Sequence, residues 1–145
     1  MTRKLSPAEA DLILADEIAP LIRSIRPLLM QIKAEVVHLD RNDPEASCEH
    51  LAEMQRILGQ MIELIELDYI EMVNRLRRSI DPLSLVRHYR IWNQRRQMLQ
   101  ISHSARGLHE MGSEAVLELR KKGTSSPAVV SIFDRLNVVT NLLTV

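Results

Sequence analysis

The stretch with most capacity for chemistry is RHYRIWNQRRQ, residues 87–97. Five of its eleven residues are Arg or His, and it holds two of the chain's four aromatic side chains. Within and just after it, Arg96 and His103 stand two helical turns apart, so a helix would place both on one face. An arginine that steadies a phosphate beside a histidine that moves a proton is a workable basis for RNA cleavage. Arg96 and His103 are therefore the candidate catalytic residues.

The Arg96-x6-His103 spacing resembles the Arg-x(4–6)-His element of the HEPN family of helical ribonucleases. This resemblance covers only that short segment. It implies a helical fold, a dimer that builds the active site, and RNA as the substrate. The chain departs from the family pattern at Gln97, where the family tends to place Asn, Asp or His after the arginine.

A second interpretation treats the same region as a binding surface. Arginines gather around a predicted joint near Asp81, where they could hold phosphates or an acidic protein surface. Trp92 stands close to Arg95 and Arg96, which suits stacking on bases or cation–π contact, although it could instead pack in the core with arginine stems alongside. The candidate macromolecule-binding residues are Arg75, Arg77, Arg78, Arg87, Arg90, Trp92 and Arg95.

A third interpretation pairs the basic stretch with the chain's own acidic stretch. Residues 40–74 carry nine acidic side chains and two arginines, whereas residues 75–106 carry eight arginines and one aspartate. If these two stretches fold into an antiparallel helical hairpin, the charges of one flank those of the other. The expected pairs are Glu71 with Arg90, and Glu66 with Arg95 and Arg96.

Length and composition limit the number of domains, the overall charge and the cellular location of the protein. The chain has 145 residues, enough for one domain with its own core, and is 46% hydrophobic and 26% charged. Its formal net charge is zero, so no global field draws it toward DNA or an anionic membrane. Cys48 stands alone, and MTRKLSPAEADL lacks the apolar region of a signal peptide. We expect a cytoplasmic protein without membrane spans.

Start signals and apolar spacing predict four helices and no strand. Ser6, Pro7 and Glu9 form a capping-box pattern, and three later cap-plus-proline pairs mark the remaining starts. Those pairs are Asp43–Pro44, Asp81–Pro82 and Ser126–Pro127. The predicted helices cover about 7–39, 44–79, 82–122 and 127–143.

Three irregularities interrupt the apolar seams. Pro20 and Pro27 fall inside the first helix, where we expect bends rather than breaks because the seam continues through both. In the second helix Asp68 falls where an apolar residue is due, and the stripe resumes at Tyr69. We interpret this as a stutter that unwinds the supercoil.

These elements predict an all-α fold, an elongated antiparallel bundle of three long helices plus a shorter C-terminal helix with coiled-coil-like seams. The short last helix leaves one groove half covered, so we expect self-association, most simply a dimer. Neither the histidines nor Cys48 show a metal-site pattern, and we expect no metal or cofactor. The sequence thus favours a non-enzymatic interaction protein that acts as a homo-oligomer and binds another protein. The alternative is a nucleic-acid-binding protein, whose enzymatic form would be a HEPN-like ribonuclease.

Overall fold

A computed structural model describes residues 4–39, 43–122 and 127–143. It confirms the all-helical prediction, since four helices pack against one another and the described residues pair as strand only at an isolated bridge between Leu5 and Ile80. Two helices each contain a π-helical turn, labelled η. The elements are α1 (Pro7–Ile13), η1 (Leu14–Ile18), α2 (Ala19–Val37), α3 (Pro44–Glu63), η2 (Leu64–Tyr69), α4 (Ile70–Ser79), α5 (Leu85–Lys122) and α6 (Pro127–Leu142).

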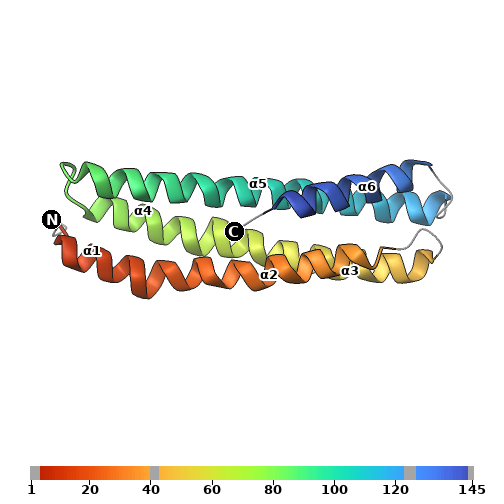
Figure 1. Ribbon diagram of the computed structural model, residues 1–145, viewed down its shortest axis with the longest axis horizontal. Helices are drawn as coiled ribbons and strands as arrows, with labels where there is room; N and C mark the ends of the chain where they lie inside the picture. The colour runs from red at the N-terminus through yellow and green to blue at the C-terminus, as the bar shows by residue number, and fades with distance from the viewer. Residues whose placement is uncertain (1–3, 40–42, 123–126, 144–145) are drawn as a thin grey trace.

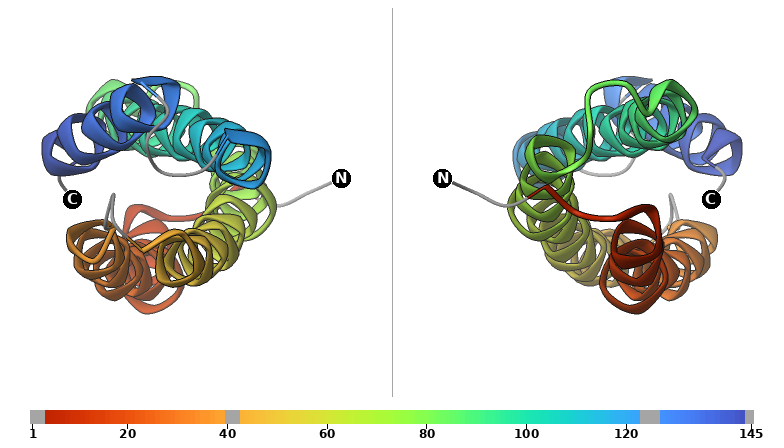
Figure 2. Two further views of the ribbon diagram at one scale, coloured as in Figure 1. Left: turned by 90° about the vertical axis from the view of Figure 1, so that its right-hand side faces the viewer. Right: turned by 90° about the vertical axis from the view of Figure 1, so that its left-hand side faces the viewer.

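Figure 1 shows a long rod in which successive helices reverse direction. The first helix, α1–η1–α2, runs away from the N-terminus, and α3–η2–α4 runs back beside it. α5 then spans the length of the rod, and α6 folds back along one half of α5. Seen from the two ends, the helices surround a common centre (Figure 2). Because α6 stops near the middle, the other half of the rod consists of three helices.

The first two helices begin where their caps predict. The Ser6 hydroxyl accepts a hydrogen bond from the Glu9 N–H at 3.2 Å, and the Glu9 carboxylate accepts one from the Ser6 N–H at 3.4 Å, which completes the capping box. The Asp43 carboxylate accepts from the Ala46 N–H at 3.1 Å. Each contact satisfies an amide that the first helical turn leaves without a partner. The Ser126 cap lies outside the described residues.

The third helix starts later than its sequence signals suggest. α5 begins at Leu85, because Asp81 closes a turn instead of capping a helix. The Asp81 carboxylate accepts from the Leu83 N–H at 3.0 Å, and the Asp81 carbonyl accepts from the Ser84 N–H at 3.0 Å. The prediction of a start at Pro82 is therefore wrong, and the helix enters the hairpin about one turn later. From Leu85 it continues without a break through Gly107 and Gly112.

The first helix stays helical through both prolines, as predicted. The π-helical turn η1 ends at Ile18, two residues before Pro20, whose missing N–H removes one helical hydrogen bond. Pro27 lies inside α2. The Pro20 carbonyl accepts a hydrogen bond from the Ser24 hydroxyl at 2.8 Å. The wider π-helical turn before Pro20 therefore accommodates the proline, and the buried residues of the helix still face the core.

The irregularity at Asp68 falls within a π-helical turn. Residues 64–69 form the π-helical turn η2, which accommodates one more residue than an α-helical turn. That extra residue leaves Asp68 exposed and returns Tyr69 to the core, where it is fully buried. A local π-bulge absorbs the interruption in the stripe.

Small residues on α5 bring α3 close to it. Gly112 is buried, and a side chain there would meet Gln55 of α3, since a Cβ added at this position would lie 3.3 Å from the Gln55 Cγ. The Gln55 amide donates to the His109 carbonyl at 3.1 Å and to the Ser113 hydroxyl at 2.7 Å. This contact fixes the register between the second and third helices.

Candidate functional site

The predicted arginine tip lies where α4 ends and α5 begins, but half of its charge is already paired. Arg87 reaches across to Asp11 of α1, with its Nη2 3.3 Å from the Asp11 Oδ2. Arg75 pairs with Glu71 one turn earlier in its own helix, at 3.0 Å. The sequence placed only Asp81 near these arginines. The Arg87–Asp11 pair could not be predicted from the sequence, because it depends on the tertiary contact of α1 with the joint.

The remaining tip residues form a surface pocket. Asn74, Arg77, Arg78 and His88 line a hollow of about 450 Å³, and no acidic side chain is among them. The Arg78 Nε donates to the Asn74 carbonyl at 3.3 Å, and the His88 Nε2 lies 3.1 Å from the Asp81 carbonyl oxygen. Guanidinium and imidazole donors lining one hollow suit an anionic group.

The predicted charge pairs between the acidic and basic stretches do not form. Among the described ion pairs, Glu66 binds Arg106 and Glu71 binds Arg75, so neither reaches the arginine expected for it. The late start of α5 explains part of the shift, because it slides the basic stretch along the hairpin. The extra residue in η2 also rotates the acidic side chains. The two stretches do pair, through Glu66, but with an arginine ten residues beyond the predicted Arg96, nearly three helical turns along α5.

Arg95 lies beside a buried tyrosine. The Tyr69 hydroxyl donates to the Gln94 Oε1 at 3.2 Å, and burial raises the Tyr69 pKa well above its usual range, an effect that the positive charge of Arg95 opposes. The Arg95 Nε is buried and has no hydrogen-bond partner among the described residues. Arg95 is less exposed than the neighbouring Arg90 and Arg96.

Trp92 is not a core residue. Its side chain is 47% exposed, and the Arg96 Cζ lies 5.4 Å from the centre of its ring in a cation–π contact. Tyr89 lies beside it, with ring centroids 6.2 Å apart. Two aromatic rings and a guanidinium therefore form one exposed cluster, which removes the alternative in which Trp92 fills the core.

This cluster belongs to a longer exposed stripe, which we name the outer face of α5. Its members recur at steps of three and four, the spacing of a coiled-coil seam, except between His103 and Glu110, where the intermediate exposed residue, Arg106, pairs with Glu66. They lie opposite the buried stripe of the same helix, which includes Ile91, Met98 and Ala105. The outer face consists of Leu85, Tyr89, Trp92, Arg96, Leu99, His103, Glu110, Glu114 and Leu117, all exposed. The sequence predicts only the buried seam of this helix, although the exposed stripe has a similar spacing.

The candidate catalytic pair lies on this outer face. Arg96 and His103 share a shallow surface pocket of about 550 Å³ with Trp92 and Leu99, and every residue that lines it belongs to α5. The shared face agrees with the predicted spacing. A single exposed helix offers a phosphate only one wall, so cleavage here would require a second surface opposite the pair.

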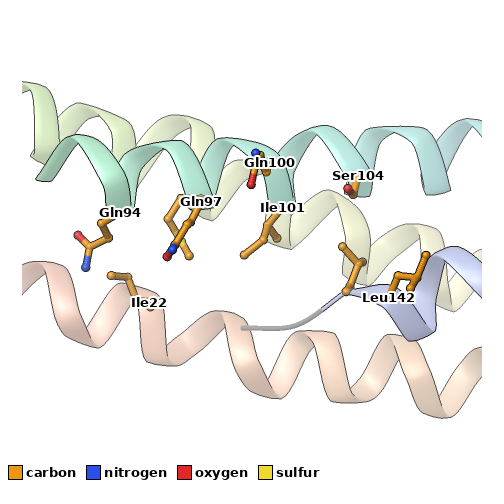
Figure 3. A pocket seen from close by; sticks show the side chains of 9 residues that line it. Ile22, Gln94, Gln97, Gln100, Ile101, Ser104 and Leu142 are labelled. Carbon is orange, nitrogen blue, oxygen red and sulfur yellow. The ribbon is translucent and has the colours of Figure 1, made fainter. Parts of the chain in front are cut away.

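The groove that α6 covers only in part is lined by more polar side chains than a hydrophobic dimer interface usually has. A pocket of about 520 Å³ lies between α2, α5 and the end of α6. Gln94 and Gln97 point from α5 toward α2, where Ile22 points back (Figure 3). Gln100 and Ser104 add further polar atoms, whereas Leu142 and Ile101 supply apolar surface. Glutamines can hydrogen-bond water, so this groove does not demand a second copy to cover it.

A cluster that sequence analysis missed joins α2 to α3. Glu35 and His38 form a Glu-x-x-His pattern, and the fold brings His50 to it, with its Nδ1 2.6 Å from the Glu35 Oε2. The His38 and His50 rings stack at 5.0 Å between centroids. The described residues contain no group of three ligating side chains arranged to hold a metal ion. We assign the cluster to the pairing of α2 with α3.

Comparisons with known proteins leave the family unassigned. No family model, no curated protein and no solved structure matches this chain. Within the described ranges, every helix falls short of the length and apolar character needed to cross a bilayer. We therefore base the functional proposal on the exposed side chains of the described residues.

Proposed function

We propose that the chain is a non-enzymatic, cytoplasmic interaction protein that works as a homo-oligomer. In this proposal a single elongated, antiparallel domain of three long helices and a shorter one, joined by coiled-coil-like seams, serves as a rigid scaffold. The observation that carries the proposal is the outer face of α5, on which aromatic and aliphatic side chains are exposed at coiled-coil spacing. Adaptor, regulator or assembly-subunit roles all use such a surface.

Exposed apolar area supports this assignment. Tyr89 is 65% exposed and Leu85 74%, and Trp92, Leu99 and Leu117 add further apolar surface along the same helix. Removing apolar surface from water contributes about 25 cal/mol per Å², so a partner that covers these side chains gains several kcal/mol before the costs of association. Contiguous apolar patches rimmed by charge are typical of protein interaction sites.

The chemistry of the face also matches that of binding hot spots. Tyr, Trp and Arg are the residue types that most often dominate the energy of protein interfaces. Here Tyr89, Trp92 and Arg96 contact one another before any partner arrives. Because they are already ordered on a 38-residue helix, binding costs less side-chain entropy. The face suits a helical partner better than a loop.

Sedimentation equilibrium tests the proposal. The native protein should show a mass above that of one chain, and a variant carrying Tyr89→Gln and Trp92→Gln should become monomeric with unchanged helical circular dichroism. Met30→Gln provides the matched control, since Met30 is 62% exposed on α2, outside the outer face. A native protein that stays monomeric at all accessible concentrations would contradict the proposal.

The tip pocket supports nucleic-acid binding as the second candidate. Arg77, Arg78 and His88 line a hollow without an acidic side chain, which suits a phosphate. Binding of labelled single-stranded RNA or duplex DNA should then weaken steeply as salt rises, and Arg77→Ala with Arg78→Ala should reduce it. Arg75→Ala is the control, because Glu71 already holds that arginine. If RNA is cleaved as well, and His103→Ala stops cleavage, the enzymatic form of this alternative is supported.

A further inference from the structure

We propose that the outer face of α5 binds a second copy of the same face, with the two α5 helices antiparallel and a two-fold axis close to His103. This inference rests on the proposed function and names its partner. It assigns a specific surface and orientation to the homo-oligomer, which the half-covered groove does not provide.

The distribution of charge along the face selects the antiparallel orientation. Its first half carries Arg96 beside the aromatic pair, and its second half carries Glu110 and also Glu114, which lies 3.9 Å from Arg135 of α6. A parallel pairing would bring Arg96 against Arg96 and Glu110 against Glu110. The antiparallel pairing brings each Arg96 near Glu110 of the partner subunit. This contact occurs once on each side of the axis, as a two-fold interface requires. His103 lies midway between Arg96 and Glu110, which places the axis beside it.

The apolar residues and the glycine fit the same pairing. Tyr89 and Leu85 stand toward one end of α5 and Leu117 toward the other, so the antiparallel arrangement brings apolar side chains of one copy near Leu117 of the partner subunit. Near the axis, Gly107 has no heavy atom within 4 Å of where a Cβ would stand. This open space lets the two helices approach each other closely at the centre.

The size of the face meets what a stable dimer needs. An aromatic side chain presents about 150–250 Å² of surface. With about half or more of both rings exposed and three leucines on the same face, two copies together bury on the order of 1,000 Å² of apolar surface. Adding the charged side chains reaches the range of stable interfaces, about 1,200–2,000 Å².

Charge reversal tests the orientation. Arg96→Glu and Glu110→Arg should each weaken the dimer by at least about tenfold, because each brings like charges together. The double variant should restore binding to nearly the native level. Arg26→Glu, an exposed arginine on α2, should change nothing. If both single variants dimerise like the native protein, or the double variant fails to recover, the antiparallel pairing is wrong even though the homo-oligomer stands.

Cross-linking locates the axis. In a Cys48→Ala background, His103→Cys should cross-link to itself with a short bismaleimide, because the two copies of residue 103 meet at the axis. Leu85→Cys should not, since the antiparallel pairing separates its two copies by roughly 50 Å at 1.5 Å per residue. Cross-linking of both variants would indicate a parallel dimer, and cross-linking of Leu85→Cys alone would indicate tip-to-tip contact; each result overturns this inference. A protein that is monomeric throughout would instead overturn the proposed function.

Discussion

Arg106 of α5 donates hydrogen bonds to both carboxylate oxygens of Glu66 in η2, a contact that joins residues 40 positions apart. The Ser102 hydroxyl donates to the same carboxylate at 2.6 Å. These donors, Arg106 first, lower the pKa of Glu66 from its ordinary 4.5 to about 2. The pair links the second and third helices and anchors the acidic stretch to the basic one.

Glu66→Gln should cost about 1 kcal/mol of unfolding free energy at neutral pH, a modest value because the side chain remains 31% exposed. Since the folded pKa is depressed, the contribution is present above pH 4.5 and is lost as pH falls from 4.5 toward 2. Urea denaturation of both proteins across that window measures the difference. A gap between native and variant that does not change with pH would contradict this account.

Deleting Asp68 should be tolerated, because it removes the extra residue of η2 and leaves an uninterrupted α-helical stripe. We expect a loss of less than about 1 kcal/mol. Deleting Gln60, an exposed residue within the regular helix α3, is the control. It should rotate every later buried residue by about 100° and cost several kcal/mol or prevent folding. Thermal unfolding followed by circular dichroism compares them, and equal losses would show that η2 does not hold an inserted residue.

Two glycines should respond oppositely to substitution. Gly59 in α3 has open space around it, so Gly59→Ala should stabilise the protein by about 0.5–1 kcal/mol through helix propensity. Gly112 contacts Gln55, so Gly112→Leu should force α3 and α5 apart and cost about 1–3 kcal/mol. Urea midpoints give both values. Stabilisation by Gly112→Leu would mean that α3 and α5 do not approach closely there.

Local signals in the sequence account for much of the fold. The capping box of Ser6 and Glu9 and the cap at Asp43 each involve residues within one helical turn, and both predicted helix starts are correct. The Asp81–Pro82 pair has the same appearance, yet Asp81 closes a turn there. A cap and a turn both use an aspartate that accepts an amide proton, so sequence alone does not separate them.

The candidate site was less accessible to sequence reasoning because it depends on register. Glu66 meets Arg106 instead of the predicted Arg95 or Arg96, nearly three turns further along α5, although each stretch was correctly recognised as acidic or basic. The outer face of α5 was missed for another reason. Its spacing is similar to that of the buried seam, but only the packing of the other helices shows which of the two stripes is covered.

The tip offers a further prediction on partner class. If α5 dimerisation is the function, raising salt should weaken the native dimer only modestly, since apolar contacts supply most of the binding energy. Nucleic-acid binding through Arg77 and Arg78 would instead fall steeply with salt. Fluorescence anisotropy of labelled RNA at two salt concentrations should show little binding. A large salt-sensitive signal that Arg77→Ala abolishes would move the function to the tip.

Trp92 is the only tryptophan of the chain, which makes the central claim directly measurable. The most direct test follows the mass of the native protein and the emission of Trp92 over one dilution series. We predict that the mass falls from two chains to one while the emission shifts to longer wavelength, with a single shared midpoint, because the ring becomes exposed as the copies separate. A constant mass of one chain, or a change in mass with no change in Trp92 emission, would contradict the account.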